Sequence, residues 1–139
     1  MIPRVLIGDA AGLEAVSDKA DAVLSLCRMG TDDWGKGAGE HHEVWLVDSA
    51  DDKDNPNLDF VLHDLAEWIA ERRDEDRTVF VHCVRAENRT PTVAAAYLAE
   101  RLGVSGEEAL ERVVPLLPHA HPSRTFSKAL DRIWPAEQG

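Results

Sequence analysis

The feature that most constrains the fold is the stretch 78–103, TVFVHCVRAENRTPTVAAAYLAERLG. Residues 78–81 are rich in β-branched and aromatic side chains, which is typical of a buried strand. Residues 84–88 are too short for an element of their own and form a loop. A helix is expected over 90–102, with Gly103 at its C-terminal cap. The stretch therefore predicts one strand–loop–helix unit.

Short apolar runs and helical patterns alternate along the rest of the chain. Ser105 with Glu108, and then Ser123, suit the starts of two C-terminal helices. This order predicts an α/β fold, with a central, mostly parallel sheet flanked by helices and a helical C-terminal half. The expected strands are 4–7, 20–26 and 44–47, the expected loop is 30–40, and the expected helices are 11–18, one starting near 57, 105–116 and 124–133.

Length and charge narrow the class of protein. The 139 residues fit a single domain, 1–139, and the 26 acidic against 15 basic residues give a net charge of −11. That charge opposes binding to nucleic acid or to an anionic membrane, so neither is expected as a partner. The sequence shows no signal-peptide pattern, no membrane-spanning run and only two cysteines, which favours a soluble protein of a reducing cytoplasm.

The junction between the strand and the helix carries the candidate chemistry. A helix N-terminus offers unpaired N–H groups and partial positive charge, which bind phosphate and favour a thiolate at Cys83. The planar guanidinium of Arg89 can hold two phosphate oxygens. A hydroxyl at Thr90 can stabilise a leaving thiolate. The competing interpretation is an inert buried cysteine, because a cysteine at the end of a core strand usually has no reaction.

The order His82-Cys83, five residues, Arg89-Thr90 resembles the His-Cys-x5-Arg-Ser/Thr signature of dual-specificity protein phosphatases, within the protein tyrosine phosphatase superfamily. The similarity covers most of the chain. It implies a phosphatase fold, a phosphocysteine intermediate, no metal and no organic cofactor. It also implies that His82 orients the loop by hydrogen bonding. The phosphate-binding residues implied by the resemblance are Val84, Arg85, Ala86, Glu87, Asn88 and Arg89.

Two departures from the family pattern lie in this loop. Ala86 stands where the family usually has glycine, which permits close backbone approach. Glu87 and Asn88 replace small or apolar residues, and Glu87 brings a negative charge that Arg85 partly offsets. These changes bear on substrate class and rate more than on the chemistry.

The reaction also needs a proton donor for the leaving oxygen. The family uses an Asp that follows a strand, about thirty residues before the cysteine. Asp48 fits this strand-then-Asp pattern best, directly after 44–47. Asp52 and then Asp51 fit the spacing better and lack the strand, so all three carboxylates remain candidates for the general acid.

Several other residues receive an interpretation. Cys27 is a possible redox partner of Cys83, since both follow strands whose carboxyl ends share one edge of a parallel sheet. The phosphoinositide-phosphatase branch of the family has a comparable pair, so the resemblance agrees. The alternative is that Cys27 is a small buried hydrophobe. Histidines 41, 42, 119 and 121 are expected in solvated loops rather than at a metal, and Trp45 is expected in the core.

The favoured function is hydrolysis of phosphomonoesters, on protein phosphotyrosine, phosphoserine or phosphothreonine, with a phosphorylated protein or small phosphomonoester as the partner. A lipid or nucleotide phosphatase with the same loop is one alternative. A sulfurtransferase of the rhodanese type is another, although it has no need of Arg89-Thr90. A non-catalytic pseudophosphatase that binds phosphoproteins is the alternative from outside the enzymes. The sequence does not predict the oligomeric state.

Overall fold

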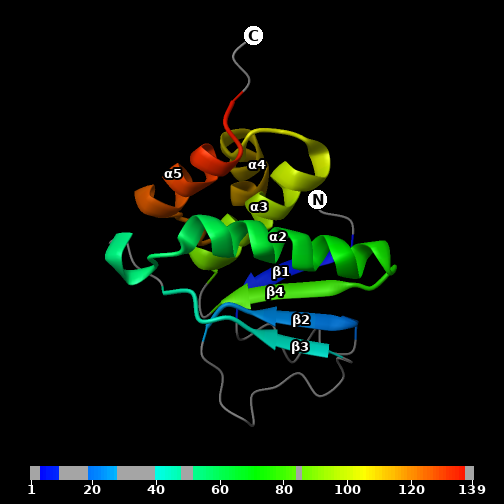
Figure 1. The fold of residues 1–139 in the computed structure, drawn as a ribbon. Helices are drawn as coiled ribbons and strands as arrows, with labels where there is room; N and C mark the ends of the chain where they lie inside the picture. Colours follow the sequence, from blue (N-terminus) through cyan, green and yellow to red (C-terminus); the bar gives the residue numbers. More distant parts are fainter. Residues whose placement is uncertain (1–3, 10–18, 28–39, 48–51, 84–85, 137–139) are drawn as a thin grey trace.

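The computed structural model of the chain describes residues 4–9, 19–27, 40–47, 52–83 and 86–136. Within these residues a four-stranded parallel sheet, in the order β1-β4-β2-β3, packs against α-helices (Figure 1). The elements are β1 Val5–Asp9, β2 Ala22–Ser25, β3 Glu40–Glu43, η3 Asp52–Asp54, α2 Leu58–Asp74, β4 Val79–Cys83, α3 Arg89–Leu102, α4 Gly106–Val113, η4 Val114–Leu116 and α5 Arg124–Ile133. The α/β prediction is confirmed.

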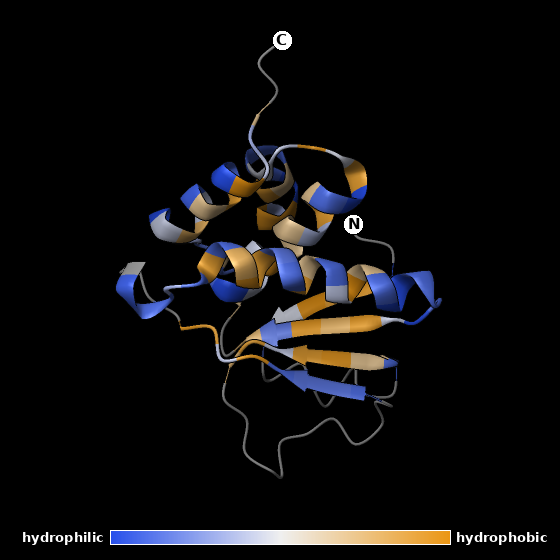
Figure 2. Cartoon of the chain, viewed as in Figure 1, coloured by the Kyte–Doolittle hydropathy of each residue, from blue (hydrophilic) through white to orange (hydrophobic). Residues whose placement is uncertain are grey.

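Strand β4 lies in the middle of the sheet and carries the candidate cysteine at its carboxyl end. It pairs in parallel with β1, where Asp9 lies opposite Cys83, and with β2, where Ser25 lies opposite His82. Every residue of β2 and β4 is buried, because each of these strands lies between two other strands and both faces of the sheet are covered there. Figure 2 shows the contrast between these apolar strands and the polar edge strand β3.

The main core lies between one face of the sheet and the helices. Leu62 and Ile69 of α2 meet Val93 of α3 and the sheet residues Leu24 and Val81 in one buried cluster. Val23 and Phe80, on the opposite face of β2 and β4, form a second, smaller cluster with Ala20, which precedes β2, and Leu6 packs on it. The period of two along each strand therefore assigns its side chains to two opposite faces.

The helix ends follow the local sequence signals. Gly103 adopts φ +67°, and its N–H donates to Ala99 O at 3.0 Å, which confirms it as the cap of α3. The hydroxyl of Ser105 accepts from the N–H of Glu108, and that of Ser123 caps α5 in the same way. α4 itself ends at Val113, and the turn η4 continues it to residue 116.

The expected strand at 44–47 is wrong. The strand in this region is β3, which begins four residues earlier in the chain. Glu40 therefore belongs to a strand rather than to a loop. An edge strand tolerates such polar residues because only one side needs a strand partner. Here Glu40 forms an ion pair with Arg72 at 3.1 Å, and the ring of His42 stacks on Trp68 with centroids 5.2 Å apart.

Two further expectations fail in this region. Histidines 41 and 42 lie in β3 and not in a solvated loop. Trp45 is 61% exposed and does not belong to the core. The expected helix over 11–18 and most of the loop 30–40 lie outside the described residues. Among the described helices, none combines the length and the apolar character that a bilayer crossing requires.

Candidate active site

Cys83 is the last residue of β4 and is 2% exposed. It belongs to the sheet face that packs on the helices. The Oγ1 atom of Thr90, in the first turn of α3, lies 3.0 Å from Cys83 Sγ in donating geometry, and 3.5 Å from the carbonyl oxygen of Gly8. A thiolate at Cys83 would therefore receive a hydrogen bond from a buried hydroxyl at the positive end of a helix.

The guanidinium of Arg89 is anchored through one of its terminal nitrogens. Its Nη1 donates to the backbone carbonyls of Leu26, at 3.2 Å, and Leu46, at 3.1 Å. Its Nε is buried and, in the part of the chain that the structure describes, has no hydrogen-bond partner. A buried N–H donor without a partner is costly in a folded protein. The arrangement suits an oxyanion ligand that accepts from Nε and completes the planar fork.

The described part of the loop is braced by the C-terminal region. Ala86 is buried and adopts φ +58°, a left-handed conformation that L-residues other than glycine adopt only at a cost. The side-chain oxygen of Asn88 accepts from the backbone N–H of Ser123 at 2.7 Å, and the carbonyl of Glu87 accepts from the N–H of His121. The loop conformation therefore depends on residues more than thirty positions away. Val84 and Arg85 lie outside the described residues.

His82 is fully buried on the opposite face of β4. Its Nδ1 lies 3.4 Å from the carbonyl oxygen of Cys83, and its Nε2 lies 2.6 Å from Ser25 Oγ. The ring stacks on Phe80 at 5.4 Å. Burial lowers the pKa of His82, although the hydrogen bond to Cys83 acts in the other direction. The ring is therefore neutral at pH 7 and suited to orienting the loop.

Sequence reasoning missed Ser25 and His41, which lie in one hydrogen-bonded group with His82. Ser25 Oγ is 2.7 Å from His41 Nε2. One signal was available: Ser25 is the polar residue inside the apolar run AVLSL, and such a residue must find a partner when it is buried.

The three candidate general acids lie within five residues of one another, after Val47. Asp48 and Asp51 lie outside the described residues, and of Asp52 the structure describes only the backbone, at the start of η3. The chain is fixed on both sides of this segment, because the side-chain amide of Asn55 bonds the N–H and the carbonyl of Val47, each at 2.9 Å. The choice among the three carboxylates stays a prediction.

Cys27 is buried two residues beyond the end of β2. Burial raises the pKa of the Cys27 thiol, the charge of Arg89 lowers it, and the charge of Cys83 raises it further. Both cysteines are buried. No group of three metal-ligating side chains gathers among the residues that the structure covers.

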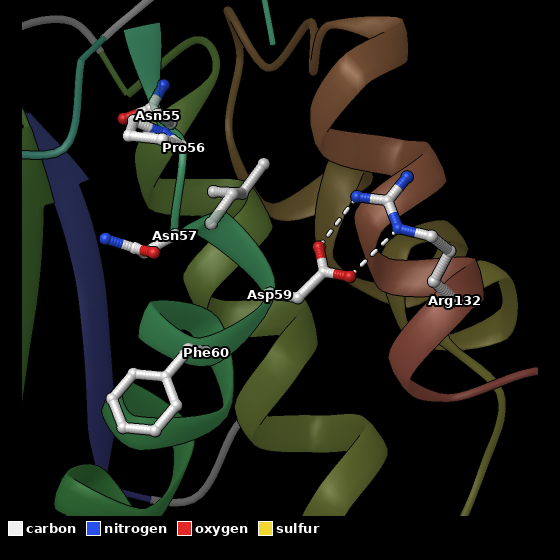
Figure 3. A pocket seen from close by; sticks show the side chains of 7 residues that line it. Asn55, Pro56, Asn57, Asp59, Phe60 and Arg132 are labelled. Atoms are coloured by element: carbon white, nitrogen blue, oxygen red, sulfur yellow. Dashed lines mark hydrogen bonds and ion pairs between the residues drawn. The ribbon is translucent and has the colours of Figure 1, made fainter. Parts of the chain in front are cut away.

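A surface pocket beside the start of α2 is separate from these residues. It is lined by Asn55, Pro56, Asn57, Leu58, Asp59, Phe60 and Arg132. Figure 3 shows Asp59 and Arg132 facing each other across it, with their closest ion-pair atoms 2.6 Å apart. None of the expected catalytic or phosphate-binding residues lines this pocket.

Comparison with known proteins shows which sequences and folds this chain resembles. No protein-family model matches the chain. The chain is 30% identical over 87 residues to "Dual specificity protein phosphatase 1" of Arabidopsis thaliana, a match that covers 63% of this chain and 44% of that protein. It is 30% identical over 80 residues to "Probable dual specificity protein phosphatase DDB_G0281963" of Dictyostelium discoideum, with 57% and 20% covered. The chain thus spans less than half the length of these curated relatives.

Solved structures extend the likeness to almost the whole chain. The crystal structure of Tk-PTP in the active form has a TM-score of 0.73 at 26% identity, over 95% of this chain and 92% of that one. Human DUSP28 has a TM-score of 0.81 at 19% identity, with the same shares covered, and shows that the fold is shared. Taken with the cysteine–arginine loop at the carboxyl edge of a parallel sheet, these comparisons show that the chain is similar in sequence and in fold to dual-specificity phosphatases of the protein tyrosine phosphatase superfamily.

Proposed function

We propose that this chain hydrolyses phosphomonoesters through a phosphocysteine intermediate. The observation that carries the proposal is the geometry around one sulfur atom. Cys83 Sγ lies 3.0 Å from the hydroxyl of Thr90 in the first turn of α3, directly after Arg89, whose buried Nε has no partner among the described residues. A nucleophile, an oxyanion clamp and a helix N-terminus thus converge within one loop.

The reaction follows in two steps. The thiolate of Cys83 attacks phosphorus while Arg89 and the loop N–H groups hold the non-bridging oxygens, and the ester P–O bond breaks as a general acid protonates the leaving oxygen. Water then attacks the phosphocysteine, the S–P bond breaks and inorganic phosphate leaves. The hydroxyl of Thr90 stabilises the departing thiolate through the contact to Sγ. The general acid is Asp48 in this proposal, with Asp52 and Asp51 as the alternatives.

The proposed substrates are phosphotyrosine and phosphoserine or phosphothreonine on proteins. Both similar proteins are named as dual-specificity protein phosphatases, which supports this class, and the proposal assigns no individual substrate protein. A phosphoprotein-binding role without turnover is a second candidate, because Ala86 adopts the left-handed conformation at a loop position where the family usually has glycine. Such strain in the loop can reduce the rate without preventing anion binding.

Turnover of p-nitrophenyl phosphate in the presence of a metal chelator tests the proposal. The wild type is expected to be active, Cys83→Ser inactive, and Cys27→Ser, the matched control at the other buried cysteine, active. Full activity of Cys83→Ser, or loss of wild-type activity in the chelator, would show that the mechanism is wrong. An inactive wild type that still binds a phosphotyrosine peptide, with binding lost in Arg89→Ala, would favour the binding role.

A further inference from the structure

Three polar side chains on neighbouring strands form a continuous hydrogen-bonded chain behind the phosphate loop. His41 Nε2 of β3 lies 2.7 Å from Ser25 Oγ of β2, and Ser25 Oγ lies 2.6 Å from His82 Nε2 of β4. The last contact of this hydrogen-bonded series is between His82 Nδ1 and the carbonyl oxygen of Cys83, which lie 3.4 Å apart. In the sheet register Ser25 lies opposite His82, and the alternation of the strands puts His41, Ser25 and His82 on the face away from α2.

The number of available protons fixes the direction of the hydrogen bonds that connect His41, Ser25 and His82. A serine hydroxyl has one proton to donate. If His82 carries its proton on Nδ1 and donates to the Cys83 carbonyl, its Nε2 accepts the proton of Ser25, and Ser25 Oγ then accepts from a protonated Nε2 of His41. Every donor meets an acceptor when both rings are neutral. Burial lowers the pKa of His41 and of His82, which agrees with neutral rings.

We propose that His41 and Ser25 are positioning residues that hold His82 in the Nδ1-protonated tautomer and thereby fix the backbone of Cys83 at the start of the phosphate loop. Stacking on Phe80 fixes the plane of the His82 ring, since the two ring planes differ by 10°. Stacking alone permits either ring edge to face the Cys83 carbonyl. The hydroxyl of Ser25 determines the edge because it bonds one nitrogen only.

The other titratable groups around the two rings act through charge and not through these hydrogen bonds. Asp9 of β1 raises the pKa of His82, and Arg89 of α3 lowers it. Glu43 raises the pKa of His41, and His42 lowers it. The hydrogen bond to His82 Nε2 comes from Ser25. Removal of Ser25 or His41 should therefore change the tautomer equilibrium rather than only shift a titration.

Ring ¹⁵N chemical shifts in the 139-residue chain test the tautomer directly. In the wild type the proton is expected on Nδ1 of His82 and on Nε2 of His41. Ser25→Ala and His41→Leu should give a mixture of tautomers at His82. His41→Gln should restore the wild-type signature, because its side-chain amide can donate to Ser25. His42→Gln is the matched control, since the neighbouring ring faces the opposite side of the sheet and stacks on Trp68.

Binding of inorganic phosphate, measured by calorimetry, reports the effect on the loop. This part rests on the proposed function, because it assumes that the loop binds phosphate. Ser25→Ala and His41→Leu should weaken binding roughly five-fold, the equivalent of one ordinary hydrogen bond, and the Gln variants should stay within about two-fold of the wild type. A wild type that binds no phosphate would contradict the proposed function and leave the tautomer test intact.

The inference is overturned if wild-type His82 carries its proton on Nε2. It is equally overturned if His41→Leu leaves both the His82 signature and the phosphate affinity at wild-type values. Should Ser25→Ala fail to fold, the pair His41→Leu and His41→Gln decides alone, because His41 is only half-buried at the sheet edge. Equal defects in His41→Leu and His41→Gln would also count against it, since a lost packing contact, and not a lost donor, would then be the cause.

Discussion

Nη1 of Arg89 donates a hydrogen bond to the backbone carbonyl of Leu46 at 3.1 Å, across 43 residues of sequence. The contact ties the first residue of α3 to the segment that leads into Asp48. It also sets the orientation of the guanidinium, because a second bond from the same nitrogen goes to Leu26. One side chain thus holds the start of α3, the end of β2 and the approach to the candidate general acid together.

The Nη1 and Nε atoms of Arg89 have separate roles, which predicts that lysine is a poor substitute. Lys carries its three donors on one nitrogen, so it cannot reproduce the planar fork whose spaced nitrogens bond the Leu46 carbonyl and two phosphate oxygens together. Arg89→Lys should reduce kcat/KM for p-nitrophenyl phosphate by about 100-fold or more, since charge-assisted bonds are lost. Arg101→Lys is the control, because Arg101 forms an exposed pair with Asp74 and should lose less than about two-fold. Near-wild-type kinetics of Arg89→Lys would contradict the clamp.

The assignment of the general acid predicts a dependence on the leaving group. Asp48→Asn should lower kcat by roughly 10²- to 10⁴-fold for a phosphotyrosine peptide, with a smaller effect on KM. The defect should shrink for p-nitrophenyl phosphate, whose leaving group needs less protonation. Asp52→Asn and Asp51→Asn serve as comparisons in the same assay. A larger defect in either of them would move the role to that residue.

The left-handed conformation of Ala86 predicts that glycine is tolerated at this position and that valine is not. Ala86→Gly removes roughly 1 kcal/mol of strain and adds a comparable entropic cost to folding, so the free energy of unfolding should change by less than about 1 kcal/mol. Ala86→Val should lose about 2 kcal/mol or more, because a β-branched residue fits this conformation poorly and the site is buried. Urea denaturation measures both variants. Equal stability of the two would show that the loop relaxes freely.

The burial of Cys27 and Cys83 at the carboxyl ends of neighbouring parallel strands predicts a reversible disulfide under oxidation. Peroxide converts the Cys83 thiolate to a sulfenic acid, and the Cys27 thiol attacks its sulfur, forming the S–S bond and releasing water. Bridging needs Cα atoms within about 7 Å, which the adjacency of β2 and β4 favours. Peptide mapping should show a Cys27–Cys83 link, and dithiothreitol should restore activity. If Cys27→Ser recovers from peroxide as well as the wild type, Cys27 has no protective role.

The buried histidines predict a loss of stability in mild acid. Burial lowers the pKa of His82 and of His41 in the folded state below the ordinary 6.5. The unfolded chain therefore binds more protons below that pH, and the free energy of unfolding should fall as the pH drops from 7.5 to 5.5. The pKa of Glu40 is also lowered, from 4.5, so its contribution is lost at lower pH. Urea denaturation should show a weaker pH dependence in His82→Gln, and an unchanged dependence would contradict this account.

Local signals in the sequence determined the main elements and the loop residues. The β-branched run before Cys83, the glycine after α3 and the serines before α4 and α5 all act within a few residues, so they can be interpreted without neighbours. The expectation of a parallel α/β sheet follows from the order of such elements. The same reasoning failed for β3 because its residues, EHHE, have no strand pattern of their own.

Only the tertiary structure decided what surrounds the loop. The sheet order puts β4 between β1 and β2, and this brings Ser25 against His82 and the Leu26 carbonyl against Arg89. The edge position of β3 then adds His41 behind Ser25. Such contacts join residues 16 to 63 positions apart, and no local propensity specifies them. The sequence by itself determined the candidate nucleophile and the candidate clamp, whereas the contacts around them depend on strand pairing, which is set by the burial of the whole sheet.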